Sequence, residues 1–349
     1  MANPNQAART VEIMEKELYV AAMRGDVMFL QADIAQSNEY LRRKTHENNN
    51  IIHIAIRHQR ENFVEASLRR LFPINSELIS ERNSKGNTPL HVAAEVGKLN
   101  IVTMLFNYLE GAADKPWRVQ NSSGNTPLHV ALIHQNAQIA QFLLNKDPDL
   151  ASIVNASKEA PLHLAIKHLV NYAESTSIIA GVEKSIKQPG AKLSRKFVIG
   201  EDMLHIITFL ANSYVACWPD ANGSTPLHQA ALLSTPYNVE VIRTILRHWP
   251  LSAEVCDASG NSILHLMTMR MSSYDEAKTL LEIPEIYALK DSQDQQGNTP
   301  LHIAAENKNI MMVRFLLEFS AKISIKNMKG ISAASLIRQH NLAEHEEED

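Results

Sequence analysis

The chain has 349 residues, of which 45% are hydrophobic and 21% charged, and its formal net charge is −4. This composition is typical of a folded protein, while the mild acidity and the aromatic content of only 6% argue against nucleic-acid binding by phosphate neutralisation or base stacking. Two cysteines, Cys217 and Cys256, cannot form a disulfide framework, so we expect free, buried thiols in a reducing compartment, the cytoplasm.

The N-terminal segment 1–15 contains no apolar stretch, so it predicts a flexible lead-in and not a signal peptide. No run of about 18 apolar residues occurs anywhere, so no membrane span is expected. The segment 18–25 then has the pattern of a first helical unit, in which Tyr19 stands where later units carry a histidine.

A motif of the form G-N/S-T-P-L-H-x-A recurs along the chain, at residues 86–95, 124–131, 223–231 and 297–306. Glycine permits the positive φ of a tight turn, threonine caps a helix, and proline suits the first helical position. The pattern resembles the ankyrin repeat, whose period is about 33 residues. The resemblance implies an all-α solenoid of helix-turn-helix units that are joined by β-turn fingers.

The motif histidine measures the period of the repeat, at His53, His91, His129, His163, His228, His265 and His302. Neighbouring histidines are 34 to 38 residues apart, except that 65 residues separate His163 from His228. We therefore expect a hidden unit at about 190–215, with Ala191–Ile199 as its inner helix and Met203–Asn212 as its outer helix. Together with a final unit that starts at Gly330, this predicts about ten units over 16–340, followed by a disordered acidic tail, 341–349.

The segment 174–196 is the most irregular part of the chain and carries a strong turn signal, Gln188-Pro189-Gly190. Its basic residues are Lys184, Lys187, Lys192, Arg195 and Lys196. A solvated loop explains them, and so does contact with anionic lipid or with an acidic partner.

The seven motif histidines raise the question of a metal site, but adjacent units stack about 10 Å apart, too far for two imidazoles to share a zinc ion. We expect each ring to bind the turn backbone of the neighbouring unit instead. Nucleophile, phosphate-binding and metal motifs are missing from the sequence, so we expect neither an enzyme nor a cofactor. Trp117, Trp218 and Trp249 either fill the longer connections or serve as binding anchors.

In a solenoid of this kind the inner helices and turns line a groove that suits a protein partner. The positions that follow the H-x-A-A core are Arg57, His58, Glu95, Val96, Ile133, His134, Lys167, His168, Leu232, Leu233, Met269, Arg270, Glu306 and Asn307. The turn tips add Ser84, Lys85, Ser122, Ser123, Ala258, Ser259, Gln295 and Gln296. We expect these residues to bind another protein, and the sequence leaves the oligomeric state open.

A narrower resemblance rests on the unit 294–305, on its counterparts at 18–26 and 220–228, and on the connections 146–151 and 248–253. These segments resemble the ankyrin region of plant ankyrin membrane proteins of the accelerated-cell-death type. That resemblance implies a role in defence and cell-death signalling. The family also has a C-terminal domain of several membrane helices, which this sequence does not contain, so the chain is either a soluble paralogue or the cytosolic half of a membrane protein. Two readings follow: a cytoplasmic protein-binding scaffold, or a peripheral adaptor at the cytosolic face of a membrane.

Overall fold

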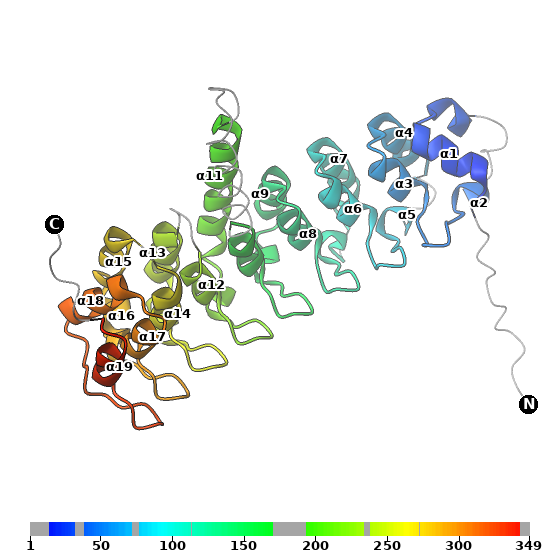
Figure 1. The fold of residues 1–349 in the computed structure, drawn as a ribbon. Coiled ribbons are helices and arrows are strands. Elements are labelled where there is room, and N and C mark those ends of the chain that lie inside the picture. The colour runs from blue at the N-terminus through cyan, green and yellow to red at the C-terminus, as the bar shows by residue number, and fades with distance from the viewer. Residues whose placement is uncertain are drawn as a thin grey trace, which may run out of the picture. The chain divides into compact units, whose positions relative to one another are not determined.

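The computed structural model of the chain describes residues 14–31, 38–71, 77–112, 114–169, 193–233, 238–271 and 273–342. The fold divides into two compact units, Met1–Ala156 and Ser157–Asp349 (Figure 1). Within the ranges just given the regular structure consists of α-helices and short 3-10 helices, without a β-strand. The expectation of an all-α repeat fold is confirmed.

The first unit consists of helical pairs in which an inner helix is followed by an outer one. Its elements are α1 (Lys16–Arg24), η1 (Val27–Gln31), α2 (Asn38–Leu41), α3 (Ile51–Arg57), α4 (Glu61–Leu71), α5 (Glu77–Ser80), α6 (Pro89–Val96), α7 (Leu99–Leu109), η3 (Pro116–Arg118), α8 (Pro127–Ile133), α9 (Ala137–Lys146) and η4 (Pro148–Ser152). The inner helices α1, α3, α6 and α8 pack against one another in this order, and α4, α7 and α9 pack on their outer side (Figure 1).

The second unit follows the same plan. It contains a helix over 161–169, then α11 (Leu193–Leu210), η5 (Tyr214–Cys217), α12 (Pro226–Ala231), α13 (Asn238–His248), η6 (Pro250–Glu254), α14 (Ile263–Arg270), α15 (Tyr274–Leu281), α16 (Pro284–Tyr287), η7 (Ala288–Asp291), α17 (Pro300–Glu306), α18 (Ile310–Glu318) and α19 (Ala333–Gln339). Here α12, α14, α17 and α19 pack in series as inner helices.

The local sequence explains the bounds of an inner helix, as α6 illustrates. Thr88 and His91 form a capping box at its start, Pro89 takes the first turn, and Gly97 ends the helix in the left-handed conformation at φ 80°. Ala93 and Ala94 are fully buried. Their small side chains let the neighbouring inner helices approach closely.

Turns of neighbouring repeats are hydrogen-bonded to one another, and each turn is also hydrogen-bonded internally. In the turn that starts at Asn83, the Asn83 Oδ1 atom accepts the backbone N–H groups of Lys85 and Asn87 at 3.0 Å each. The Ser84 N–H donates to the Glu47 carbonyl of the preceding turn at 2.8 Å. The next turn repeats this bond, from the Ser122 N–H to the Lys85 carbonyl at 3.1 Å. A ladder of backbone bonds therefore joins the turns within a unit.

The hidden repeat that we expected at 190–215 is not formed. Helix α11 runs without a break over 18 residues, so the segment that we assigned to an inner helix, Ala191–Ile199, lies in the same helix as the expected outer one from residue 193 onward. The His163 Nε2 atom lies 3.2 Å from the carbonyl oxygen of Ser224, which belongs to the turn of the repeat that contains His228. The helix over 161–169 and α11 therefore belong to one repeat, and the described residues contain nine inner helices.

The predicted ends of the repeat domain lie largely outside the described residues. This holds for 1–13 of the lead-in and for 343–349 of the acidic tail, so both remain predictions. Met14, which we placed in the lead-in, is buried, and its N–H donates to the Lys44 carbonyl at 2.7 Å.

Candidate partner-binding groove

The structure places the predicted groove residues at the C-terminal ends of the inner helices. Most are accessible: Arg57, His134, Lys167, Met269, Arg270, Glu306 and Asn307 are exposed, and His58, Glu95, Val96, Ile133, His168 and Leu232 are half-buried. Leu233 is an exception, since only 2% of its surface is exposed. Its assignment to the groove was wrong, because the short helix α12 ends at Ala231 and the chain then turns Leu233 into the core.

The predicted turn-tip residues, from Ser84 and Lys85 to Gln295 and Gln296, are all exposed. Of the charged groove residues, Lys167 forms an ion pair with Glu159 at 3.1 Å, so part of its charge is neutralised within the fold. The predicted lipid-contact residues Lys184, Lys187 and Lys192 lie outside the described residues. Arg195 and Lys196 belong to α11, in a part whose side chains are not described.

The motif histidines are buried and bind the next turn. The His91 Nε2 atom lies 2.9 Å from the Asn125 carbonyl oxygen, and the Thr88 hydroxyl lies 2.8 Å from His91 Nδ1. A carbonyl only accepts, so the ring carries its proton on Nε2, and the threonine hydroxyl donates to Nδ1. The same pair of contacts recurs at His228, His265 and His302. These histidines connect repeats.

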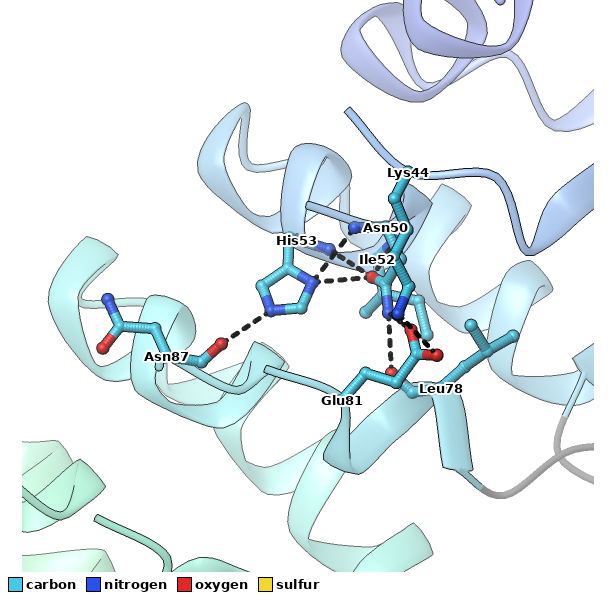
Figure 2. Close-up of polar contacts among 7 residues, drawn as sticks. All are labelled: Lys44, Asn50, Ile52, His53, Leu78, Glu81 and Asn87. Carbon is cyan, nitrogen blue, oxygen red and sulfur yellow. Dashed lines mark hydrogen bonds and ion pairs between the residues drawn. The ribbon is translucent and has the colours of Figure 1, made fainter. Parts of the chain in front are cut away.

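His53 differs from this pattern, as Figure 2 shows. Its cap is Asn50, whose Oδ1 atom lies 2.7 Å from His53 Nδ1, while His53 Nε2 lies 3.0 Å from the Asn87 carbonyl. The Asn50 amide cannot be reversed, because its Nδ2 atom donates to Leu78 O at 2.8 Å and to Glu81 at 3.0 Å. The Asn50 backbone N–H donates to His53 Nδ1 at 3.4 Å, so the single N–H group of the neutral ring lies on Nε2 and donates to the Asn87 carbonyl.

Burial lowers the pKa of several motif histidines. Desolvation lowers the pKa of His53 and of His91 to about 4, and it also lowers the pKa of His163, His228 and His265. The rings are therefore neutral at pH 7, as their role as single donors requires.

Two of the three tryptophans have the first of the two roles that the sequence left open, that of filling a connection. Trp117 is buried, lies 4.8 Å from the Phe106 ring and donates to Asp147 at 2.7 Å. Trp249 is half-buried and donates to the Ala211 carbonyl at 2.8 Å. Both fill connections between repeats. Trp218 is 48% exposed and contacts Tyr214 edge to face, so it does not fill a connection between repeats.

Both cysteines are free thiols, as expected, but neither is fully buried: Cys217 is half-buried and Cys256 is exposed. Partial burial raises the pKa of both thiols, which keeps them protonated and weakly nucleophilic. No group of three metal-ligating side chains is found in the part of the chain that the structure covers.

A pocket of about 290 Å³ opens beside the first turn of the first unit. We call it the Tyr19 pocket, and its lining residues are Tyr19, Thr45, His46, Glu47, Asn49, His53, Ile54, Arg57 and His58. Of these residues, only Arg57 and His58 were predicted from the sequence to line the groove. The departure from the repeat at Tyr19 was the signal for the rest, because the pocket lies beside the inner helix that has no motif histidine.

These features define a class of protein: a helical repeat scaffold that displays a polar and apolar surface along stacked inner helices. The ankyrin-repeat family matches the chain three times, over residues 18–116, 109–188 and 237–327, which together cover more than half of its length. The chain therefore belongs to the ankyrin-repeat family, whose members serve as protein–protein interaction modules. No helix in the described ranges has the length and apolar character needed to cross a bilayer.

Two curated relatives are similar over a limited region. Transcription factor MBP1 of Saccharomyces cerevisiae is 24% identical over 131 residues, which is 34% of this chain and 16% of that protein. Transcription factor MBP1 of Kluyveromyces lactis is 26% identical over 126 residues, which is 33% of this chain and 17% of that protein. The match thus spans about a sixth of the length of each relative.

Proposed function

We propose that the chain is a non-enzymatic scaffold that binds a partner protein through the exposed ends of its inner helices and through its turn tips. The observation that carries this proposal is the contrast between two sets of residues. The H-x-A-A core of each repeat is buried and hydrogen-bonded, whereas Arg57, His134 and Arg270 beyond it are exposed. The buried core residues stabilise the fold, so the exposed residues beyond them are available for recognition.

Pull-down with groove variants of each unit tests this proposal. One variant replaces Glu95 and His134 with alanine, and another replaces Lys167 and Arg270. Two matched controls change pairs of exposed residues on the outer helices in the same way. One control changes Asn107 and Gln138 together, and the other changes Arg243 and Arg314 together. Partners identified by affinity purification should be lost with at least one groove variant and retained with both controls. Equal recovery from all four proteins would contradict the proposal.

The cellular role that we propose is cytoplasmic signalling in plant defence and cell death. Its support is the resemblance of the unit 294–305 and of the connection 248–253 to plant ankyrin proteins of the accelerated-cell-death type. The test is removal of the protein from its source organism, followed by measurement of cell death after pathogen challenge and by cell fractionation. An unchanged response would remove the defence role and leave the scaffold proposal intact.

A second candidate is a peripheral adaptor at the cytosolic face of a membrane. The five basic residues of the segment 184–196 favour it, because each basic residue near an anionic surface contributes about 1 kcal/mol. In a flotation assay the chain should rise with vesicles that contain phosphatidylserine and not with neutral vesicles. Neutralisation of Lys184, Lys187, Lys192, Arg195 and Lys196 together should abolish flotation. Failure of the unaltered chain to float would exclude this candidate.

A further inference from the structure

The Tyr19 pocket concentrates hydrogen-bond donors that the fold does not use. Arg57 and His46 are exposed, His58 is half-buried, and Tyr19 is 38% exposed. Among the described residues, none of these four side chains forms a hydrogen bond or an ion pair. Lys44, which lies in the same connection, is different, because it is held by Glu81 at 3.0 Å.

We propose that the Tyr19 pocket binds one carboxylate of a partner protein, from an acidic side chain or from a C-terminus. This proposal rests on the groove function proposed above and names the chemical group that the first repeats recognise. The planar guanidinium of Arg57 matches a carboxylate with two parallel hydrogen bonds. The imidazoles of His46 and His58 and the hydroxyl of Tyr19 add donors around it.

Glu47 gives the pocket a preference among anions. It lines the same pocket, and its carboxylate accepts a hydrogen bond from Asn49 at 3.2 Å but pairs with no cation of the described chain. The repulsion of an anion by Glu47 grows with the charge of the ligand and offsets the corresponding gain in attraction to Arg57. We therefore expect a singly charged carboxylate to bind more tightly than a phosphate group with a charge near −2.

The pocket lies beside α1, the inner helix of the first unit that has Tyr19 in place of the motif histidine. In the next two repeats, His53 and His91 reach the carbonyl oxygens of Asn87 and Asn125 in the following turn. The equivalent carbonyl beside Tyr19 is that of Asn49, which accepts the Thr45 N–H as Asn87 accepts that of Asn83. A Tyr19→His change should therefore form the missing ring-to-turn bond and remove the tyrosine hydroxyl from the pocket.

The test uses the full chain and small probes observed by NMR of the histidine rings. N-acetylglutamate N-methylamide presents a side-chain carboxylate, and N-acetylalanine presents a C-terminal one. N-acetylglutamine N-methylamide is the uncharged control, and N-acetylphosphoserine N-methylamide is the dianion. We expect saturable shifts of His46 and His58 with one or both carboxylates, none with the glutamine probe, and affinity weaker for phosphoserine. Equal shifts with the glutamine probe, or no shift with either carboxylate, would overturn the proposal.

Two variants separate recognition from misfolding. Arg57→Gln should weaken binding of the carboxylate probe by at least about tenfold, a loss of ~1.4 kcal/mol in binding free energy. Arg314→Gln, at an exposed position of the outer helix α18 in the second unit, is the control and should leave binding unchanged. Tyr19→His should abolish the response while it raises the urea midpoint of the chain. Retained binding in both Arg57→Gln and Tyr19→His would contradict the assignment.

The outcome can be distinguished from failure of the groove function. If the partner protein is lost with the groove variants of either unit but is retained with Arg57→Gln and with Tyr19→His, the groove function stands and the carboxylate pocket does not. Loss of the partner with Tyr19→His, in a protein of raised stability, supports both.

Discussion

At the residue scale, the motif histidine acts as a connector that works only in its neutral form. Its Nδ1 atom accepts from the capping hydroxyl and its Nε2 atom donates to the next turn, as in the contacts of His302 with Thr299 and Ile331. A second proton would displace the capping hydroxyl and place a charge in the core. The stability of the stack therefore depends on pH through these side chains.

We predict that the chain loses stability as the pH falls below about 6.5, the ordinary histidine value. The folded-state pKa of His53 and His91 is about 4, so the unfolded chain binds protons first, and stability is lost between these two values. Each such histidine costs on the order of 1 kcal/mol by pH 5.5. Urea midpoints at pH 7 and pH 5.5 measure the effect. The decline should be shallower in His91→Gln, and a midpoint that stays constant over this range would refute the assignment.

A second prediction compares two turn glycines in the same conformation. Gly86 and Gly330 have φ of 72° and 74°, but a Cβ at Gly86 would lie 2.6 Å from the Ser122 backbone nitrogen, whereas nothing lies within 4 Å at Gly330. Gly330→Ala should cost only the left-handed backbone strain, about 1–2 kcal/mol. Gly86→Ala should cost clearly more, because two bonded turns must separate. Urea unfolding of the two variants decides, and equal losses would mean that the turns are not tightly stacked.

At the element scale, an asparagine ladder joins neighbouring turns. The Asn83, Asn121, Asn155 and Asn327 side chains each donate to an asparagine of the preceding repeat at 2.8 to 3.1 Å. Other turns begin with aspartate, which also accepts the two turn N–H groups but has no proton to donate across the repeat boundary. Asp257 and Asp294 instead accept from the asparagines of their own turns.

This difference predicts unequal effects of exchanging the two residues. Asn121→Asp keeps the bonds within the turn but places a carboxylate oxygen opposite the Asn87 Oδ1 acceptor. It should therefore destabilise the chain by about 1–3 kcal/mol. Asp294→Asn is the matched control and should change stability by less than half as much, since it removes no bond between repeats. Thermal and urea unfolding provide the measurement. A loss in Asp294→Asn as large as in Asn121→Asp would argue against the ladder.

At the scale of the whole molecule, each repeat is stabilised mainly by its neighbours, because an isolated helical pair cannot bury its own apolar face. Phe106 illustrates this in the first unit, where its ring lies 4.8 Å from Trp117 and 5.6 Å from Phe142 of the next repeat. Phe315 has the corresponding role in the second unit, 5.2 Å from Tyr274 of the preceding repeat. Damage at either site should remain local.

We predict reciprocal patterns of hydrogen exchange for two truncations. Phe106→Ala and Phe315→Ala each empty a fully buried site, at a cost of roughly 3–5 kcal/mol. Phe106→Ala should lower protection in α6 to α9 and leave α17 and α18 unaffected, and Phe315→Ala should do the reverse. Uniform loss of protection in both variants would indicate a single cooperative unit instead of coupled repeats.

The sequence by itself determined the repeat, its helical class and the bonding of the motif histidines to the neighbouring turn, because the T-P-L-H-x-A pattern encodes turn, cap and core within a few residues. It failed where the pattern lapsed: the segment 193–210 has helical character throughout, and only packing shows that it is one outer helix and not two. The Tyr19 pocket also needed the tertiary structure. Its walls come from an inner helix, from the next turn and from the following helix, and sequence distance conceals that they meet.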